Sequence, residues 1–437
     1  MPELIVTAAP VDKALSVHPA FTDKKVSDFA EQSRQQEFNL LVIASDCELQ
    51  QSIAVPVRRI LAGTLFGKGQ MADIADAVRL HEAGVVFVNH QLSPVQQRNL
   101  EKAWSAKVVD RTGLILEIFA ARARTREGVL QVELASLTYQ LGRLVRSWTH
   151  LERQRGGFGF LGGPGERQIE LDRRMIRGRI KSLRKDLDKV RRMRATQRKG
   201  RQRKAIPTVA LVGYTNAGKS TLFNRLTGAD VYADDRLFAT LDPTLRLLEL
   251  DDGGRVMLSD TVGFVQELPH ELVDAFRATL EEVIEADLIL HVRDAAAPQV
   301  IEQGQVVEQT LAQLGLEGDV SPPVIEVWNK VDLVPDVRSV IREGISGSRV
   351  AVSALTGKGV NELTTLLSGW LAQEMVELKL TLAISDGRSL AFCYEKGEVL
   401  SKTERGDVVN VVVRLHVADA GRFNLNLESG GHCLKEV

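Results

Sequence analysis

An eight-residue run near the middle of the chain constrains the fold more than any other feature. It reads Gly213-Tyr214-Thr215-Asn216-Ala217-Gly218-Lys219-Ser220 and fits the pattern G-x-x-x-x-G-K-S. The short apolar segment TVALV precedes it, and a helical pattern follows it as far as Gly228. A strand, a glycine-rich loop and a helix in this order predict a phosphate-binding loop within an α/β domain.

Each residue type in this loop suits the binding of a nucleoside triphosphate. The glycines allow backbone N–H groups to curl around a β-phosphate at the positive end of the new helix. Lys219 would bridge the β- and γ-phosphates, and the Ser220 hydroxyl would ligate Mg²⁺, which prefers oxygen ligands. We therefore expect Mg²⁺ as the cofactor.

Three later strand patterns end in residues that suit the rest of a guanine nucleotide. RVMLSDTVGF (255–264) delivers Asp260, which can hold Mg²⁺, and Gly263, whose N–H can reach the γ-phosphate. VIEVWNKVD (324–332) delivers Asp332, whose carboxylate accepts hydrogen bonds from guanine N1–H and N2–H₂, with Asn329 and Lys330 bracing and covering the base. RVAVSAL (349–355) offers backbone groups to guanine O6. Because ligands bind at the carboxyl ends of strands in such sheets, this order predicts GTP as the substrate.

The segment RLFATLDPTLRLLEL (236–250) should contain the threonine that senses the γ-phosphate and Mg²⁺. Thr240 and Thr244 are both candidates on residue type alone. Phe264 stands directly after Asp-Thr-Val-Gly, where many GTPases have a glutamine that orients the attacking water. Gln266 and Glu267 are nearby, but the sequence gives no geometry that selects either. We expect slow hydrolysis by the protein alone and acceleration by a bound partner.

Patterns of short strands and helices surround this loop on both sides. NLLVIA (39–44), VVFVN (85–89) and KVVD (107–110) read as strands of an N-terminal α/β domain, with a helix at 71–84. No element is assigned to residues 1–36. Around the phosphate loop we expect strands at 209–212, 245–250, 255–259, 287–292, 324–328 and 350–353, with a hairpin turn at 251–254 that makes one edge antiparallel.

Residues 127–155 and 168–194 form two helical patterns with matching heptad seams. We expect an antiparallel helical hairpin, joined by the glycine-rich loop that contains Gly157-Phe158-Gly159-Phe160-Leu161-Gly162. The glycine pattern resembles a dinucleotide fingerprint, but that motif requires a preceding strand, and here a helix precedes it. The loop is therefore interpreted as the tip of the hairpin.

Positive charge is concentrated in the second arm of this hairpin. Residues 168–204 contain 16 Lys and Arg against 4 Asp and Glu, although the whole chain has a net charge of only −1. A solvated helix face usually mixes both signs, and such a surplus repels itself unless a polyanion meets it. A nucleic-acid partner is favoured over a merely solvated face.

The rest of the chain indicates a small C-terminal domain. It gives little indication of disulfide bonds or of membrane-spanning segments. ELKLTLAI (377–384) and VVNVVVRLHVA (408–418) read as strands, with a helix expected over 389–405. The three cysteines are far apart, which favours reduced thiols over a disulfide framework or zinc site. Without a signal peptide or an apolar run of membrane-spanning length, we expect a cytoplasmic, monomeric protein. Association with ribosomes or a membrane surface stays open.

The predicted fold class is therefore multidomain α/β. We expect an N-terminal α/β domain (1–125), a basic helical hairpin with a glycine-rich tip (126–204), a P-loop GTPase domain with a mostly parallel, doubly wound sheet (205–373) and a small C-terminal α+β domain (374–437).

These segments together resemble the HflX family of translational GTPases, within the Obg-HflX group. The resemblance is carried by DRTGLILEIFAARARTREG (110–128), LQVELASLTYQLGRL (130–144), GGPGERQIELDRR (162–174), GYTNAGKSTLFNRLT (213–227), LFATLDPTLR (237–246), DTVGFVQELPHELVDAFRATLEE (260–282), NKVD and SAL. It spans about residues 38–372, and the tail is similar to the extra C-terminal domain of some members. One departure is Arg167, where many members have threonine.

The resemblance implies a GTPase that binds the large ribosomal subunit and splits stalled or stressed ribosomes into subunits. The hairpin would then lie along ribosomal RNA, where Phe158 and Phe160 can stack on unpaired bases or simply pin the tip. The family's magnesium threonine aligns with Thr240, and Phe264 matches its hydrophobic replacement of glutamine. The alternatives are a GTP-dependent switch that binds another enzyme and a ribosome-assembly GTPase.

The residues and the resemblance together give one set of expected site residues. Lys219, Thr240 and Gly263 are the expected catalytic groups, and Ser220, Thr240 and Asp260 are the expected metal ligands. The expected nucleotide-binding residues are Gly213, Tyr214, Thr215, Asn216, Ala217, Gly218, Lys219, Ser220, Thr221, Phe238, Ala239, Thr240, Leu241, Asp242, Asp260, Thr261, Val262, Gly263, Asn329, Lys330, Val331, Asp332, Ser353, Ala354 and Leu355.

Overall fold

The computed structural model describes residues 12–22, 28–154, 164–202, 206–229, 237–238, 240, 243–266, 280–316, 321–336, 348–416, 420 and 435–436. The chain divides into two compact units. The first contains residues 1–188, 232–242 and 262–279, and the second contains residues 189–231, 243–261 and 280–437. Three separate sheets confirm the predicted multidomain α/β class. The exact domain boundaries given above stay a prediction.

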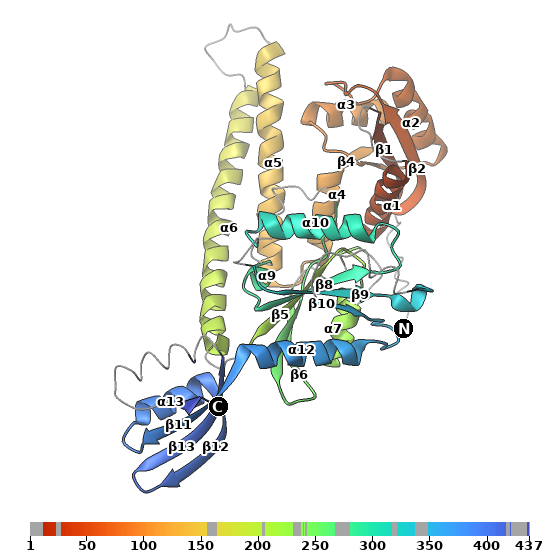
Figure 1. Ribbon diagram of the computed structural model, residues 1–437. Coiled ribbons are helices and arrows are strands. Elements are labelled where there is room, and N and C mark those ends of the chain that lie inside the picture. Colours follow the sequence, from red (N-terminus) through yellow and green to blue (C-terminus); the bar gives the residue numbers. More distant parts are fainter. Residues whose placement is uncertain are drawn as a thin grey trace, which may run out of the picture. The chain divides into compact units, whose positions relative to one another are not determined.

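The N-terminal sheet has four parallel strands in the order β2-β1-β3-β4 (Figure 1). Its elements are β1 (Lys13–Phe21), α1 (Asp28–Ala44), β2 (Glu48–Val57), α2 (Lys68–Leu80), β3 (Val85–Val88), α3 (Pro94–Trp104) and β4 (Lys107–Asp110). The predicted strands at 85–89 and 107–110 and the helix at 71–84 are confirmed within a few residues.

The strand predicted at 39–44 is wrong, because these residues complete helix α1. Phe38 and Leu41 are fully buried, whereas Leu40 and Ile43 are 48% and 45% exposed. This spacing of three to four residues is that of a helix with one buried face. The first strand is instead β1, in a region where the sequence patterns indicated no element.

The two predicted long helices are present as α5 (Arg126–Gln154) and α6 (Pro164–Gln202), preceded by α4 (Arg111–Arg122). Helices α5 and α6 lie side by side (Figure 1), and the Arg179 guanidinium donates to both carboxylate oxygens of Glu133 at 2.7 and 3.0 Å. Ile180, Leu183 and Leu187 of α6 are buried, as the heptad seam predicted. The glycine-rich tip, including Phe158 and Phe160, lies outside the described residues.

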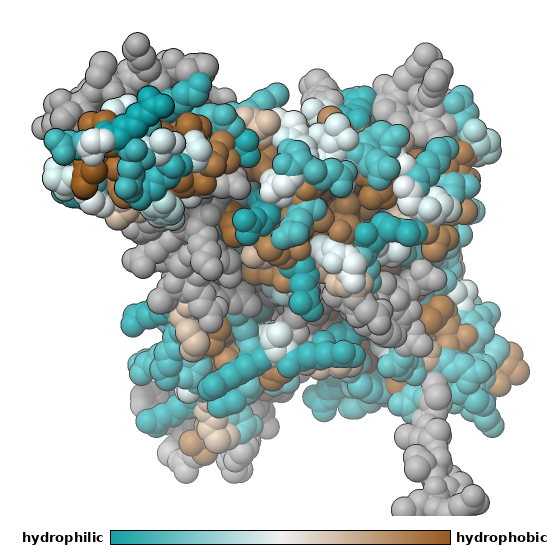
Figure 2. Space-filling view, turned by 90° about the horizontal axis from the view of Figure 1, so that it is seen from below, coloured by the Kyte–Doolittle hydropathy of each residue, from teal (hydrophilic) through white to brown (hydrophobic). Residues whose placement is uncertain are grey.

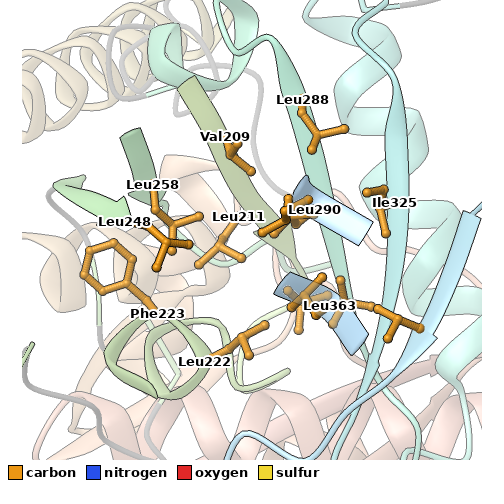
Figure 3. Close-up of a cluster of buried hydrophobic side chains, with 14 of the residues drawn as sticks. Val209, Leu211, Leu222, Phe223, Leu248, Leu258, Leu288, Leu290, Ile325 and Leu363 are labelled. Atoms are coloured by element: carbon orange, nitrogen blue, oxygen red, sulfur yellow. The ribbon is translucent and has the colours of Figure 1, made fainter. Parts of the chain in front are cut away.

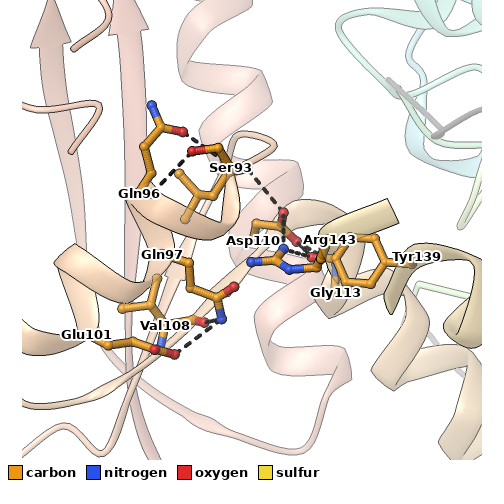
Figure 4. A network of polar contacts seen from close by, with 10 residues as sticks. Ser93, Gln96, Gln97, Glu101, Val108, Asp110, Gly113, Tyr139 and Arg143 are labelled. Atoms are coloured by element: carbon orange, nitrogen blue, oxygen red, sulfur yellow. Dashed lines mark hydrogen bonds and ion pairs between the residues drawn. The ribbon is translucent and has the colours of Figure 1, made fainter. Parts of the chain in front are cut away.

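Asp110 joins three elements of the first unit through a single buried carboxylate (Figure 4). It caps α4 by accepting from the Gly113 N–H at 2.8 Å, and it accepts from the Leu92 N–H at 3.1 Å. The Tyr139 hydroxyl of α5 donates to it at 2.7 Å. Burial, reinforced by this carboxylate, raises the pKa of Tyr139, so the hydroxyl remains a donor. Asp110 therefore ties the end of β4 to both α4 and α5.

The sheet that carries the phosphate loop has six strands in the order β10-β9-β8-β5-β7-β6. Its elements are β5 (Thr208–Gly213), α7 (Lys219–Thr227), β6 (Thr244–Glu249), β7 (Arg255–Asp260), α9 (Glu281–Ile284), β8 (Leu288–Asp294), α10 (Val300–Gln313), β9 (Val324–Asn329), β10 (Ser348–Ala351) and α12 (Val360–Glu374). All six predicted strands are confirmed within a few residues, and the turn at 251–254 makes β6 antiparallel to β7.

The core of this sheet fixes the helix that follows the phosphate loop. Figure 3 shows Leu222 and Phe223 of α7 directed toward Leu211 and Leu248 of the strands. All four side chains belong to one buried cluster. Because α7 is held by this packing, the amino end of the helix has a fixed position at the end of β5.

The C-terminal sheet is antiparallel in the order β12-β13-β11-β14. Its elements are β11 (Met375–Ala383), α13 (Gly387–Lys396), β12 (Gly397–Arg405), β13 (Val408–His416) and β14 (Lys435–Glu436). The helix expected over 389–405 is only half correct, because it ends where β12 begins at Gly397. A Cβ on that glycine would lie 2.8 Å from the Arg414 carbonyl oxygen of the paired strand, so the close strand pairing favours glycine there.

In the described part of the chain, no helix is both long enough and apolar enough to cross a membrane. On the face shown in Figure 2, hydrophobic residues occur in small groups between hydrophilic ones.

Candidate functional site

The phosphate loop leaves β5 in a backbone conformation that only glycine accommodates easily. Gly213 and Gly218 have φ angles of 156° and 86°. A Cβ at Gly213 would lie 2.2 Å from the Val292 carbonyl oxygen, and a Cβ at Gly218 would lie 2.3 Å from the Asn329 side-chain nitrogen. The two glycines of the motif are therefore required by close approach to residues of β8 (Leu288–Asp294) and β9 (Val324–Asn329) as well as by backbone angle.

Lys219 begins helix α7 with a buried side chain. Its ammonium group donates to the carbonyl oxygens of Gly213 and Tyr214 at 3.1 and 2.9 Å, both within the loop. Burial lowers the pKa of Lys219 to about 8, and the Asp260 carboxylate opposes that shift. Phosphate oxygens at this position would stabilise the charged form and raise the pKa of Lys219 again.

The structure brings two predicted magnesium ligands together. The Ser220 hydroxyl at the start of α7 donates to the Asp260 carboxylate at the end of β7 at 2.7 Å. The next residue, Thr261, donates through its hydroxyl to the Leu211 carbonyl oxygen at 2.6 Å. This bond ties the start of the Asp260–Gly263 segment to β5 and thereby fixes Asp260 beside the phosphate loop.

Asn329 connects the phosphate loop to the loop after β10. Its side-chain nitrogen donates to the Ala217 carbonyl oxygen at 2.9 Å, and its side-chain oxygen accepts from the Ala354 N–H at 2.9 Å. Both bonds are buried, so this asparagine braces the predicted base site, as its place in Asn-Lys-Val-Asp indicated. The Asp332 side chain is exposed and therefore accessible to a ligand.

Two residues that support this site were missed by sequence reasoning. The Asp294 carboxylate, at the end of β8, pairs with the Lys330 ammonium at 2.8 Å. The Arg225 guanidinium, on α7, donates to the Ala354 carbonyl oxygen at 3.0 Å and also to that of Leu355. The sequence offered a signal for Asp294, because this residue is a carboxylate at the end of a predicted strand. It offered no signal for Arg225, because the chain contains many arginines of the kind usually found on surfaces.

The segment with the two candidate threonines is only partly described. Thr244 is the first residue of β6 and pairs with Asp260 in the sheet. Thr240 and Phe238 belong to the first compact unit, as do Val262 and Gly263, whereas Ser220 and Asp260 belong to the second. Ala239, Leu241 and Asp242 lie outside the described residues, as does Glu267. The assignment of Thr240 to Mg²⁺ stays a prediction.

The residues that are described around the loop fit a nucleoside triphosphate with Mg²⁺. Ser220 and Asp260 offer adjacent hard oxygen ligands, which Mg²⁺ prefers. The Thr215 hydroxyl in the loop is buried without a hydrogen-bond partner among the described residues. A buried polar group of this kind is satisfied when a ligand supplies the partner.

A phosphate loop, an adjacent serine–aspartate pair and a guanine-type Asn-Lys-Val-Asp segment, all at strand ends of a mostly parallel sheet, define a P-loop GTPase. Comparison with protein families matches residues 32–120 to "GTP-binding GTPase N-terminal" and 122–201 to "GTP-binding GTPase Middle Region". Residues 208–330 match "50S ribosome-binding GTPase" and 340–436 match "HflX C-terminal domain". The chain belongs to the HflX family of GTPases, which confirms the resemblance noted from the sequence.

Two relatives match nearly the whole chain in sequence. GTPase HflX of Magnetococcus marinus is 50% identical over 409 residues, which cover 94% of each chain. GTPase HflX of Escherichia coli K12 is 45% identical and covers 94% of this chain and 95% of its own. A GTP-binding protein from Sulfolobus solfataricus, solved in complex with GDP, is 24% identical with a TM-score of 0.45 and covers 83% of this chain and 99% of its own.

Proposed function

We propose that this GTPase binds the large ribosomal subunit through the basic face of α6, and that binding of GTP with Mg²⁺ at the phosphate loop promotes splitting of stalled ribosomes. The proposal rests on the family membership and on the charge of the helical hairpin. Stimulation of hydrolysis by the ribosome, the cytoplasmic location and the monomeric state belong to the same proposal.

In this proposal the chain's own groups bind and orient the triphosphate. Lys219 and the backbone N–H of Gly263 hold the β- and γ-phosphates, and Asp332 accepts from the guanine base. Ser220, Asp260 and Thr240 would hold Mg²⁺, which neutralises charge on the phosphates when bound. Because Thr240 would contact both Mg²⁺ and the γ-phosphate, GTP would hold its segment in place more firmly than GDP does.

The residue directly after Gly263 is Phe264, which cannot orient a water molecule, and this supports slow hydrolysis by the isolated protein. Phe264 is 2% exposed, so this position contributes packing rather than a polar group. A partner that completes the site is therefore expected to raise the turnover number. Single-turnover hydrolysis with and without large subunits measures this, and equal rates in both conditions would contradict it.

The charge of α6 is the observation that carries the ribosomal proposal. Arg177, Lys181 and Arg184 are exposed, while the apolar seam of the same helix is buried. An exposed cationic face on a rigid helix suits the phosphate backbone of RNA. A protein partner that binds an apolar surface is the alternative, and it differs in its dependence on salt.

Co-sedimentation with large ribosomal subunits tests the proposal. We expect binding with a non-hydrolysable GTP analogue that is stronger than binding with GDP and that weakens steeply with salt. Replacing Arg177, Lys181 and Arg184 by glutamine should lower the logarithmic salt slope by about 1 for each lost phosphate contact.

The matched control replaces Arg79, Arg98 and Lys102 by glutamine, since these are exposed basic residues on helices of the N-terminal domain. This control should bind like the wild type. Unchanged affinity and salt slope in the α6 variant would overturn the proposed RNA contact. Gradient analysis of intact ribosomes then separates splitting from simple binding or from a role in subunit assembly.

A further inference from the structure

The two segments expected to sense the γ-phosphate both belong to the compact unit that contains helix α4. The first segment holds Phe238, two residues before Thr240. The second holds Gln266, three residues after Gly263. Each of these residues makes a specific contact with a side chain of α4, although α4 lies in the N-terminal part of the sequence.

Arg111, the first residue of α4, anchors the segment after Gly263. Its guanidinium is buried and donates to the Gln266 carbonyl oxygen at 2.7 Å. The same group donates to Glu37 at 2.6 Å and to the Asn89 side-chain oxygen at 2.9 Å. Because three acceptors from separate elements hold one planar group, its position is fixed and so is the carbonyl that it binds.

Phe119, two turns further along α4, anchors the segment before Thr240. Its ring lies 4.6 Å from the ring of Phe238 at an interplanar angle of 78°, an edge-to-face arrangement. Both side chains are buried. Phe238 has a φ angle of 59°, a left-handed conformation that bulky residues adopt only when the surroundings compensate for its cost. The aromatic contact with α4 is such a compensation.

We propose that Arg111 and Phe119 of helix α4 are positioning residues for nucleotide recognition, which hold the segments around Gly263 and Thr240 ready for the γ-phosphate. The inference rests on the nucleotide site given under Proposed function. Ordering these segments before the ligand arrives reduces the entropy lost when GTP binds. GDP does not require the same ordering, so the contacts with α4 favour GTP over GDP.

The ratio of affinities for a non-hydrolysable GTP analogue and for GDP, measured with Mg²⁺ on the full chain, tests the proposal. We expect Phe119→Leu to lower this ratio by about fivefold, the scale of one aromatic contact. Phe238→Leu should lower it similarly. If the two rings act through their mutual contact, the double variant should lower the affinity ratio no further than either single variant does.

Phe66→Leu is the matched control. Phe66 is a buried ring that packs against Trp104 in the core of the N-terminal sheet. The Phe66→Leu variant should lose a comparable amount of stability but keep the wild-type ratio of affinities for the GTP analogue and GDP. Arg111→Lys keeps a positive charge beside Glu37 but cannot reach three acceptors, so it should also lower the ratio.

An unchanged or increased ratio in Phe119→Leu and Arg111→Lys, or an equal loss in Phe66→Leu, would overturn the role of α4. The measurement contains no ribosomes. Failure of ribosome binding therefore leaves this result intact, and failure of the α4 variants leaves the ribosomal proposal intact. A wild-type chain that binds no GTP analogue would overturn both.

Discussion

At the scale of single residues, the nucleotide site depends on side chains that connect loops rather than on isolated contacts. Asn329 holds the phosphate loop and the loop after β10 with one amide group. The Asp260 carboxylate, at the end of β7, accepts from the Ser220 hydroxyl at the start of α7. The residue types were evident in the sequence, but the loops that each one joins became evident only in three dimensions.

Asn329→Ala should weaken the binding of GDP by about 10- to 100-fold. The change removes the two buried hydrogen bonds to the Ala354 N–H and the Ala217 carbonyl, and each such bond contributes about 0.5–1.5 kcal/mol. A fluorescence titration with labelled GDP measures the affinity. Asn361→Ala, at an exposed position of α12, is the control and should bind normally. Equal affinities in both variants would contradict the bracing role.

His291 makes stability depend on pH. Burial, followed by the positive charges of Arg293 and Lys219, lowers the pKa of His291 to about 3. Below the ordinary pKa of 6.5, the unfolded chain takes up a proton that the folded chain does not, so stability falls as pH falls from about 6.5 toward 3. The loss from this histidine should reach about 2 kcal/mol at about pH 5.

His291→Gln removes this titrating group, so the pH profile of unfolding should become flatter between about pH 7 and 5. Denaturant unfolding at several pH values, read from the phosphate-loop domain, measures the difference between the two proteins. Carboxylates contribute equally to both profiles and cancel in that difference. Parallel profiles would show that His291 titrates normally in the folded protein.

At the scale of elements, the sequence patterns predicted the long helices and most short strands, and they failed for one short apolar run. The seams of α5 and α6 extend over several turns, so their period of three to four residues was clear. The run at 39–44 was too short to show a period, and its β-branched residues favoured a strand. Tertiary packing decided the matter by burying Phe38 and Leu41 on one face of α1. The domain boundaries stay predictions at this scale.

Leu183→Ala should destabilise the helical hairpin by about 2–5 kcal/mol, because the fully buried side chain leaves a cavity in the seam. Leu171→Ala on the same helix is the control, since Leu171 is 54% exposed and surface changes usually stay within about 0.5 kcal/mol. Hydrogen exchange of the α6 amides reports the local effect. Equal protection in both variants would argue against the seam.

At the scale of the whole molecule, segments distant in sequence share one compact unit. Residues 232–242 and 262–279 group with residues 1–188 rather than with the strands that flank them in sequence. Nucleotide-dependent changes in these segments would therefore act directly on contacts with α4. Helix α4, which Gln266 and Phe238 contact, is followed directly in the chain by α5, the first arm of the hairpin.

Phe264→Gln should not accelerate basal GTP hydrolysis. The side chain is buried, so the substitution places an amide where apolar packing is required rather than beside the reacting water. We expect a basal rate equal to or below that of the wild type in single-turnover assays, with stimulation by ribosomes retained where folding is intact. A rise of about tenfold or more would show that this position reaches the γ-phosphate.

The sequence by itself determined the phosphate-loop motif, the family and the six strands of the central sheet, because these depend on local spacing and on residue chemistry. Only the tertiary structure revealed that Arg111 binds the Gln266 carbonyl oxygen and that Phe119 packs against Phe238. Such pairs lie more than a hundred residues apart. No local period or motif encodes such pairs. They form only when elements that are distant in the sequence pack together and bury their polar and aromatic groups.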